Sequence, residues 1–478
     1  MKFMIAFATR TVRVNPILVA VFILLFSTKS VAQQENTTVF DHVNVIPMTT
    51  EIVVPDQRVV VTQGRIASIG PSSSVGTPIG AVVIDAAGNY MIPALTDMHV
   101  HLEGEAWNMM IPAGSRFTSD EIDFRDILFL YIANGITTVD VLFAFPEHLV
   151  LREKIKRHEL LGPRLILSRM IDGAGKAWPP PLGVWINNAS EARAAIQEIH
   201  NQGYDRVKVY SFLDPASYDS IVATSRQLGI PVDGHVPFST SVEHVLSSGQ
   251  RMIAHIEEVM KFAKDYTPEQ VGFYTDLIAR SDTWVVSSLI LNRNLNALLK
   301  DSAGQFTKPG TQYLHPMASG VWSYVYSNLY KPIPEPSRRM LVDGYEQFQK
   351  PFAREFARKG GKLMVGTDAL VPSTIPGISL HEELGELVSA GLRPYEALRA
   401  STTNTLVFLG ESDRAGTIEA GKVADLVLLD GNPLEDISRT KDIYGVMVQN
   451  RWIPKSEIDQ RLREISESYA RLRIKKGM

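Results

Sequence analysis

Residues 93–411 alternate between short apolar segments of β type and longer helical segments, and this alternation limits the fold more than any other feature. A strand–helix–strand order favours a parallel sheet, because each helix carries the chain back to the starting edge. The sequence predicts eight strands, at residues 95–101, 137–143, 164–168, 205–211, 231–235, 251–256, 284–289 and 362–368. Helical patterns lie between or after them, at residues 120–134, 191–202, 215–228, 268–281, 380–390 and 394–401. Together these elements predict an α/β fold, a (β/α)8 TIM barrel.

Both ends of the chain carry a different pattern, in which short strands follow one another with turns between them. In residues 33–92 we expect strands at 39–45, 58–62, 65–69 and 82–85. The pattern returns in residues 412–455, with strands expected at 424–429 and 444–449. We therefore predict that the two ends meet in one small β-sandwich domain. The charged residues 456–478 alternate with helical periodicity and predict a surface helix.

The N-terminus has the pattern of a secretory signal peptide. Lys2, Arg10 and Arg13 precede an apolar run at residues 16–26, and Ser30-Val31-Ala32 offers a small-x-small cleavage site. The run is shorter than the roughly 20 residues that a stable membrane span needs. We expect residues 1–32 to be removed and the protein to be secreted or periplasmic; an uncleaved anchor is the alternative. The sequence has no cysteine, so no disulfide stabilises the exported chain.

The charge balance indicates which partners the chain is suited to bind. Lys and Arg number 48 against 52 Asp and Glu, which gives a formal net charge of -4. Such a balance gives no electrostatic reason to expect binding to nucleic acid or to an anionic membrane. We expect a small-molecule or peptide substrate instead.

One connection, residues 292–345 between the seventh and eighth strands, is much longer than the others. It carries the aromatic residues Tyr313, Trp322, Tyr324, Tyr326 and Tyr330. Connections of this length are usually lids or binding segments. Three interpretations stay open: a helical insert that packs its own aromatic side chains, a lid over a site, or a contact between copies in a homo-oligomer.

Several histidines and one aspartate stand at the ends of predicted strands. His99 and His101 end the first strand, and residues two apart on a strand point to the same face. His235 ends the fifth strand, His255 lies at the end of the sixth, and Asp368 ends the eighth. The C-terminal ends of barrel strands carry the chemistry in TIM-barrel enzymes. Each histidine alone is compatible with a buried, hydrogen-bonded side chain, but the set predicts a metal site. Nitrogen and oxygen ligands without thiols favour Zn2+.

Lys208 lies inside the fourth strand, between Val207 and Val209. Burying an unpaired ammonium group is costly, so this position needs an explanation. One explanation is a carbamate, formed from the neutral amine and carbon dioxide, which could bridge two metal ions. The other is a salt bridge to a carboxylate elsewhere in the fold.

Three further residues are candidates for a role beside the metals. Tyr210 follows Lys208 by two positions and would face the same way, as a polariser of a substrate oxygen or as a core residue. His381 opens the helix after the eighth strand, as a catalytic or substrate contact or as a surface residue. Asp97 would share the inward face with His99 and orient a ligand.

Three segments of the chain resemble the amidohydrolase superfamily. They are residues 92–101, which end in His99-Val100-His101, then residues 366–369, and residues 416–427, which resemble the family's return into the small β domain. The resemblance extends over the whole mature chain. The surroundings of Lys208 and residues 381–401 are similar to the imidazolonepropionase-like branch, and within it to Xaa-Pro dipeptidases and metallo-carboxypeptidases. Ala94 stands where the family usually has glycine, and residues 178–181 match nothing in the family pattern.

The resemblance implies two divalent metal ions. His99, His101 and Asp368 would hold one ion, His235 and His255 the other, and carboxylated Lys208 would bridge them. It also implies a metal-dependent hydrolase that cleaves amide bonds in peptides or N-acyl amino acids by a metal-activated hydroxide. Asp368 would act as general base and then general acid. A mononuclear deaminase, a lactonase or cyclic amidase, and a non-catalytic binding barrel are the alternatives.

Overall fold

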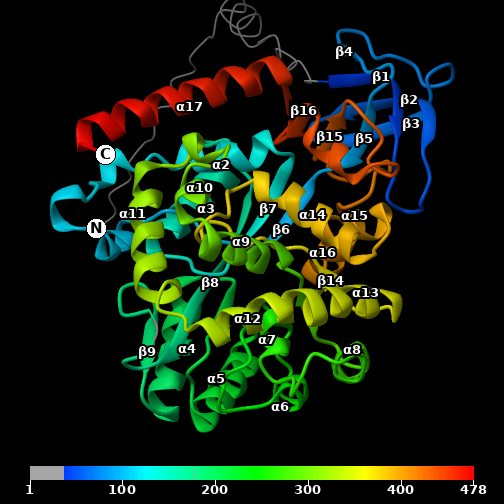
Figure 1. Ribbon diagram of the computed structural model, residues 1–478. Coiled ribbons are helices and arrows are strands. Elements are labelled where there is room, and N and C mark those ends of the chain that lie inside the picture. Colours follow the sequence, from blue (N-terminus) through cyan, green and yellow to red (C-terminus); the bar gives the residue numbers. More distant parts are fainter. Residues whose placement is uncertain (1–36, 177) are drawn as a thin grey trace, which may run out of the picture. The chain divides into compact units, whose positions relative to one another are not determined.

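Eight parallel strands form the centre of the computed structural model, which describes residues 37–176 and 178–478 (Figure 1). They are β6 (Leu95–Val100), β7 (Ile136–Val141), β8 (Arg164–Gly173), β10 (Arg206–Val209), β11 (Val232–Gly234), β12 (Met252–Ile253), β13 (Trp284–Val286) and β14 (Leu363–Met364). Their order in the sheet follows their order in the chain, and β9 (Val184–Ile186) is added beside β8. All eight predicted barrel strands are confirmed.

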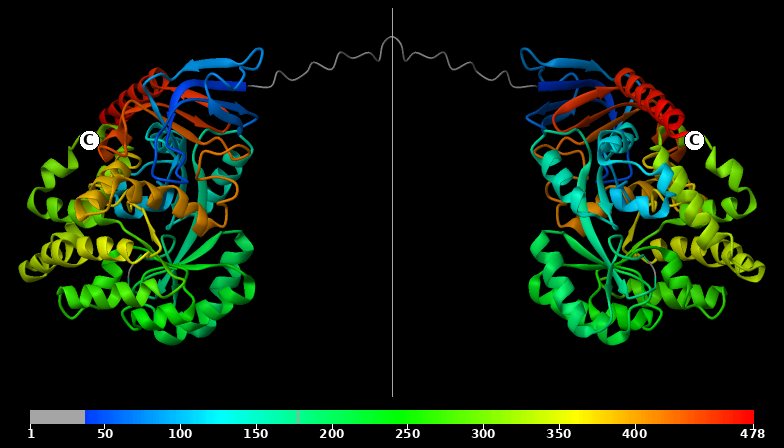
Figure 2. Two further views of the ribbon diagram at one scale, coloured as in Figure 1. Left: turned by 90° about the vertical axis from the view of Figure 1, so that its right-hand side faces the viewer. Right: turned by 90° about the vertical axis from the view of Figure 1, so that its left-hand side faces the viewer.

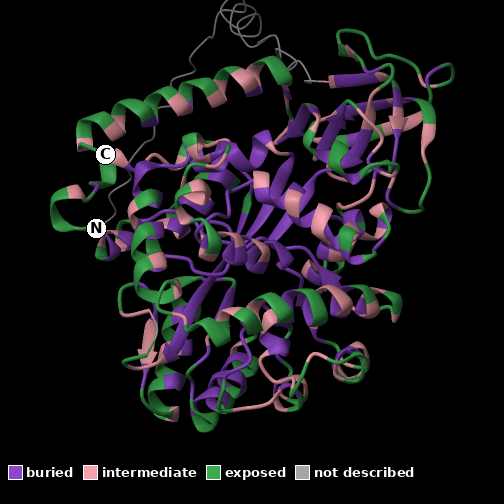
Figure 3. Ribbon diagram, viewed as in Figure 1, coloured by how far each residue is buried: buried purple, intermediate pink, exposed green. Residues whose placement is uncertain are grey.

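Hydrogen bonds between the first and last strands close this sheet into a barrel. The Met98 amide donates to the Val365 carbonyl at 3.0 Å, and the Asp368 amide donates to the His99 carbonyl at 2.8 Å. Val100 and Ala369 add an isolated parallel bridge. The inner strands are buried on both faces, as strands covered by helices must be, and Figure 3 shows them as a continuous buried centre.

Helices cover the outside of the barrel (Figures 1 and 2). They are α2 (Phe124–Ala133), α3 (Pro146–Lys156), α4 (Ala189–Gln202), α5 (Pro215–Leu228), α6 (Val242–Ser248), α8 (Pro268–Ala279), α13 (Lys350–Arg358), α14 (Ile378–Ala390), α15 (Pro394–Ser401) and α16 (Thr403–Leu409). Local sequence sets their ends: Asn188 and Asp214 cap α4 and α5 with their side chains. Gly203 and Gly229 end the same helices in the left-handed conformation, which glycine adopts without strain.

The two ends of the described chain build one separate sheet, as predicted. Its strands are β1 (Thr37–Val45), β2 (Val54–Thr62), β3 (Arg65–Pro71), β4 (Val82–Asp85), β5 (Tyr90–Pro93), β15 (Leu426–Leu429), β16 (Ile443–Val448) and β17 (Arg451–Pro454). They follow the order β17-β16-β15-β5-β1-β2-β3, with β4 beside β1. An isolated bridge joins Arg65 of the edge strand β3 to Val423, which lies shortly before β15. The sheet therefore curls around an apolar core of its own. In Figure 2 the blue N-terminal strands lie beside the orange C-terminal ones.

The long connection before β14 is helical throughout most of its length. It contains α9 (Leu289–Lys300), α10 (Ser302–Phe306), α11 (Pro316–Val325), the π-helical turn η5 (Tyr326–Tyr330) and α12 (Glu335–Gly344). The indole of Trp322 donates to the Leu370 carbonyl at 2.8 Å, which ties α11 to the segment that follows Asp368. The structure therefore agrees with two of the three interpretations from the sequence. The insert packs some of its aromatic side chains inward, and it also covers the end of the barrel.

The predicted C-terminal surface helix is confirmed as α17 (Lys455–Lys476), which buries Ile465 and Tyr469 against the body. Near its end, Arg473 donates to the carbonyls of Thr311 and Leu314, at 3.2 and 2.9 Å, directly before α11. The helix therefore holds residues 311–314, directly before α11, which we call the foot of the insert.

The predicted signal peptide, residues 1–32, lies outside the described residues, so it and the secreted or periplasmic location stay predictions. Within residues 37–176 and 178–478, no helix combines the length and the apolar character needed to cross a membrane. The homo-oligomer also stays a prediction.

Replacing Arg473 should loosen the foot of the insert. We expect Arg473→Ala to lower stability by about 1 kcal/mol or more, because two carbonyls lose a charged donor. Arg471→Ala is the matched control, since Arg471 lies on the same helix, is 72% exposed and reaches only Glu467 at 3.9 Å. Midpoints of urea unfolding measure both. Equal midpoints for the two variants would show that α17 does not fasten the insert through Arg473.

Candidate metal centre

Six predicted site residues meet at the C-terminal end of the barrel, where the strands release the chain into loops. They are His99, His101, Lys208, His235, His255 and Asp368, and all six side chains are buried. His99 lies on β6 and Lys208 on β10. His101, His235 and His255 lie just after the ends of β6, β11 and β12, and Asp368 lies in the segment after β14. The sheet thus gathers residues that are up to 269 positions apart, from 99 to 368, into one cluster.

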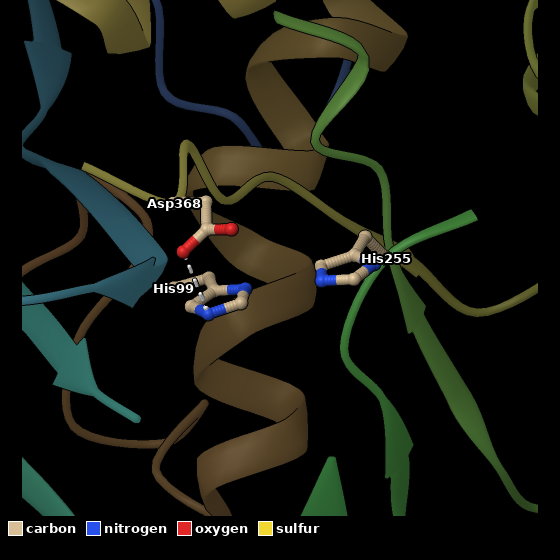
Figure 4. A group of neighbouring side chains, drawn as sticks. All are labelled: His99, His255 and Asp368. Atoms are coloured by element: carbon tan, nitrogen blue, oxygen red, sulfur yellow. Dashed lines mark ion pairs between the residues drawn. The ribbon is translucent and has the colours of Figure 1, made fainter. Parts of the chain in front are cut away.

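His99, His101 and Asp368 form the tightest group. The Oδ1 atom of Asp368 lies 3.1 Å from Nε2 of His99 and 2.7 Å from Nε2 of His101. Asp368 adopts a φ of 59°, a conformation that costs a non-glycine residue free energy and often marks functional sites. Figure 4 shows the carboxylate directed at His99, with His255 beside them.

A second group joins His235, His255 and Glu258. The Nδ1 atom of His235 lies 2.8 Å from Ser211 Oγ and 3.2 Å from Glu258 Oε1. His255 stacks parallel to His99 at 5.5 Å between ring centroids, so it links the two groups. The sequence prediction missed Glu258, which is fully buried on the short helix α7 (Ile256–Met260). Its position three residues after His255 was the available signal.

Lys208 lies between the groups. Its Nζ atom is 3.3 Å from Nε2 of His99, and burial lowers its pKa to about 8. Within the described part of the chain it forms no ion pair, which argues against the salt-bridge explanation. A lowered pKa increases the fraction of neutral amine, which is the form that reacts with carbon dioxide.

The donor set fits divalent metal ions. Ligand atoms of His99, His255 and Asp368 lie within 4.8 Å of one another, and so do those of His235, His255 and Glu258. Among the described residues, the buried Nε2 atom of His235 and Nδ1 atom of His255 have no hydrogen-bond partner. Burial also lowers the pKa of all four histidines, which keeps the imidazoles neutral and their lone pairs free for a metal.

Asp97 supports the site in a way that differs from the expected one. Its carboxylate accepts hydrogen bonds from the amides of His99, at 3.2 Å, and Thr367, at 3.0 Å. It also accepts from the Thr367 hydroxyl at 2.6 Å. Asp97 therefore holds the backbone of two of the segments that carry metal-ligand candidates, and it does not contact an imidazole ring. Burial raises its pKa to about 7.

The structure does not bring His381 to this cluster. The His381 side chain is buried on α14, with its Nδ1 atom 3.0 Å from Thr440 Oγ1, in a segment near the small β domain. His381 therefore lies apart from the metal-ligand candidates, and its expected contact with the substrate or role in catalysis stays a prediction. Tyr210, in contrast, lies at the site, with its ring 4.1 Å from that of His235.

A cavity of about 250 Å³ opens beside the metal-ligand candidates. Tyr210, Lys208 and Asp368 line its polar end. Burial raises the pKa of Tyr210 to about 12, so its hydroxyl stays protonated, and a hydrogen bond with Trp178 opposes that shift. Trp178, from the unmatched segment 178–181, also lines the cavity. That segment therefore contributes to the pocket.

A closed barrel with buried histidines and carboxylates at the C-terminal ends of its strands has the arrangement of a TIM-barrel enzyme. Residues 90–453 match the amidohydrolase family, and the chain belongs to this family of hydrolases. The predicted resemblance is thereby confirmed.

Individual relatives are distant. An imidazolonepropionase from Pseudomonas fluorescens is 23% identical over 433 residues, 82% of this chain and 92% of that protein. An adenine deaminase from Paracoccus denitrificans is 40% identical over only 65 residues, 14% of this chain and 10% of that protein. A solved Xaa-Pro dipeptidase with bound methionine superposes with a TM-score of 0.67 at 21% identity, covering 88% of this chain and all of the other. Bottromycin amidohydrolase gives 0.69 at 21%, covering 95% and 94%. These structures show a shared fold.

Thr367 should be essential for holding Asp368. Its buried hydroxyl donates to Asp97 and accepts from the Ala369 amide at 3.1 Å. Thr367→Val removes the hydroxyl from both hydrogen bonds, and we expect it to destabilise the protein by about 1–3 kcal/mol. Thr367→Ser keeps the hydroxyl and should stay close to the unmodified protein. Urea unfolding compares them, and identical losses in both variants would assign the effect to packing instead of the hydrogen bonds.

Proposed function

We propose that this protein is a metal-dependent hydrolase that cleaves an amide bond in a peptide or an N-acyl amino acid. The observation that carries the proposal is the convergence of four histidines, two carboxylates and Lys208 at the C-terminal end of the barrel. His99, His101 and Asp368 would hold one ion, and His235 and His255, with Glu258 beside them, the other. Zn2+ suits such nitrogen and oxygen ligands.

Lys208 would join the two halves as a carbamate. Carboxylation replaces a buried ammonium cation with an anion, which removes the cost of an unpaired positive charge among neutral imidazoles. Its position, with Nζ 3.3 Å from a His99 nitrogen, supports this role.

Divalent ions bound here would supply Lewis acidity, which polarises a carbonyl group and lowers the pKa of water. The chain itself supplies the proton transfers. Burial alone would raise the pKa of Asp368, but His99 and His101 beside its carboxylate hold it well below its ordinary value. Asp368 is therefore ionised and can accept a proton from the attacking water. It can then deliver that proton to the leaving nitrogen.

Tyr210 would orient the substrate. Its pKa of about 12 keeps the hydroxyl protonated, so the group can donate a hydrogen bond to a carbonyl oxygen at the polar end of the cavity. A hydrogen-bond donor aimed at an oxygen that gains negative charge stabilises the transition state.

The similarities to a Xaa-Pro dipeptidase and to bottromycin amidohydrolase support an amide substrate. The curated relatives favour a second candidate, a cyclic amidase or a deaminase, because they are an imidazolonepropionase and an adenine deaminase. Release of ammonia separates a deaminase from an amide hydrolase that liberates an amino acid.

Metal analysis of the purified protein, coupled to turnover of a panel of dipeptides and N-acyl amino acids, tests the proposal. We expect about two metal ions per chain and release of free amino acid from at least one member. Chelation should abolish turnover, and Zn2+ added together with bicarbonate should restore it more fully than Zn2+ alone. One ion per chain, ammonia release and no effect of bicarbonate would instead establish the mononuclear deaminase.

Asp368→Asn should separate metal binding from proton transfer. An amide oxygen can still bind a metal but cannot carry a proton, so we expect kcat to fall about 100-fold or more while metal remains bound. Asp282→Asn is the control, since Asp282 is an exposed loop carboxylate paired with Lys362. Near-normal kcat in the Asp368→Asn variant with its metals in place would remove Asp368 from the proton-transfer role.

A further inference from the structure

The cavity beside the metal-ligand candidates has two apolar walls. One, which we call the loop wall, consists of Trp107, Phe143 and Trp178 from the segments after β6, β7 and β8. The other, the insert wall, consists of Leu291 of α9 and of Val321 and Val325 of α11. Within the loop wall, the Phe143 ring lies 5.9 Å from that of Trp178 and 5.7 Å from that of His101, so the aromatic surface reaches the metal-ligand candidates. An apolar group between these walls would lie directly beside the reacting bond.

Exposed apolar side chains lie on and near the lining of the cavity. Leu329 of the insert lines the cavity and is 48% exposed. Phe212 directly follows Ser211, which lines the cavity, and its ring lies 5.5 Å from that of Phe238. These two aromatic residues are 46% and 53% exposed. Large exposed apolar side chains at a pocket are typical of a binding surface for an apolar ligand.

Lys261, which lines the cavity, is already paired within the protein. Lys261 forms an ion pair with the buried carboxylate of Glu258, and its Nζ atom lies 3.9 Å from Glu257. Its ammonium group also lies 5.3 Å from the centre of the Phe238 ring. Lys261 therefore has two carboxylate partners and one aromatic partner before any substrate arrives.

We propose that the substrate carries a large apolar group, a long acyl chain or an aromatic side chain, next to the amide bond that is cleaved. The polar end of the cavity takes the amide, and the space between the loop wall and the insert wall takes the apolar group. This inference rests on the proposed amide hydrolysis, but the apolar subsite can be tested without turnover.

Two matched series test the substrate class on the full-length protein. One lengthens the acyl group, from N-acetyl- to N-hexanoyl- and N-decanoyl-L-alanine. The other enlarges the side chain, from N-acetyl-L-alanine to N-acetyl-L-leucine and N-acetyl-L-phenylalanine. Because each buried methylene contributes about fourfold to binding, we expect kcat/KM to rise about tenfold or more along at least one series. Equal kcat/KM across both series would overturn the inference and leave amide hydrolysis intact.

Binding of unreactive probes keeps the two proposals separate. Titration calorimetry with acetamide and octanamide should give measurable binding only for octanamide, or a Kd at least tenfold lower for it. If no amide is hydrolysed but octanamide still binds more tightly, the proposed function fails and the apolar subsite stands. Equal or absent binding of both probes, together with flat kinetics, would overturn the subsite.

Leu329 offers a variant that can be made without disturbing the core, because about half of its side chain is exposed. We expect Leu329→Asp to reduce the preference for long or aromatic groups at least fivefold, while Leu329→Met preserves it. Met340→Asp is the matched control, a 58% exposed residue on α12 of the same insert that does not line the cavity. An unchanged preference for long or aromatic groups in Leu329→Asp, or an equal loss of it in Met340→Asp, would show that Leu329 does not belong to the apolar subsite.

Discussion

The hydrogen bonds that close the barrel are the interaction on which the rest of the structure depends. The Asp97 carboxylate accepts from the amides of His99 and Thr367, and the Asp368 amide donates to the His99 carbonyl. Asp368 is held at a φ of 59°, a conformation that costs a non-glycine residue about 1–3 kcal/mol. The same bonds that join the first and last strands thus hold the segments of His99 and Asp368, two of the metal-ligand candidates, against each other. Closing the sheet therefore also forms this part of the site.

A site built this way is costly before any ion binds. Four neutral imidazoles, an amine and two carboxylates are removed from water, and several of their nitrogen atoms have no protein partner among the described residues. Unsatisfied polar groups in the interior destabilise a fold. The apolar strands and the helices around them offset that cost. The charged form of Lys208 would add to it, because its ammonium group has no ion-pair partner among the described residues.

The order of the elements and most of the candidate set could be predicted, because His99, His101, His235, His255 and Asp368 each lie at or near the end of an apolar run of strand length. Glu258 was missed although it follows His255 by three positions, because the predicted strand ran to residue 256, where the structure already begins a short helix. The position of His381 could not be predicted, because closeness to Asp368 in sequence does not say which way its side chain points. The intervening segment turns, and α14 points the imidazole at Thr440. The pocket walls depend on packing between distant segments, which no local pattern records.

The metal-ligand candidates and the apolar lining of the cavity come from different parts of this chain. The candidates belong to strand ends of the barrel, whereas Leu291, Val321 and Val325 belong to helices α9 and α11. The foot of the insert is held by α17, which lies beyond the region 90–453 that matches the family. A substitution in the apolar wall of the insert therefore replaces no metal-ligand candidate. If the proposed reaction takes place in this cavity, substrate preference would depend largely on side chains that the strand ends do not supply.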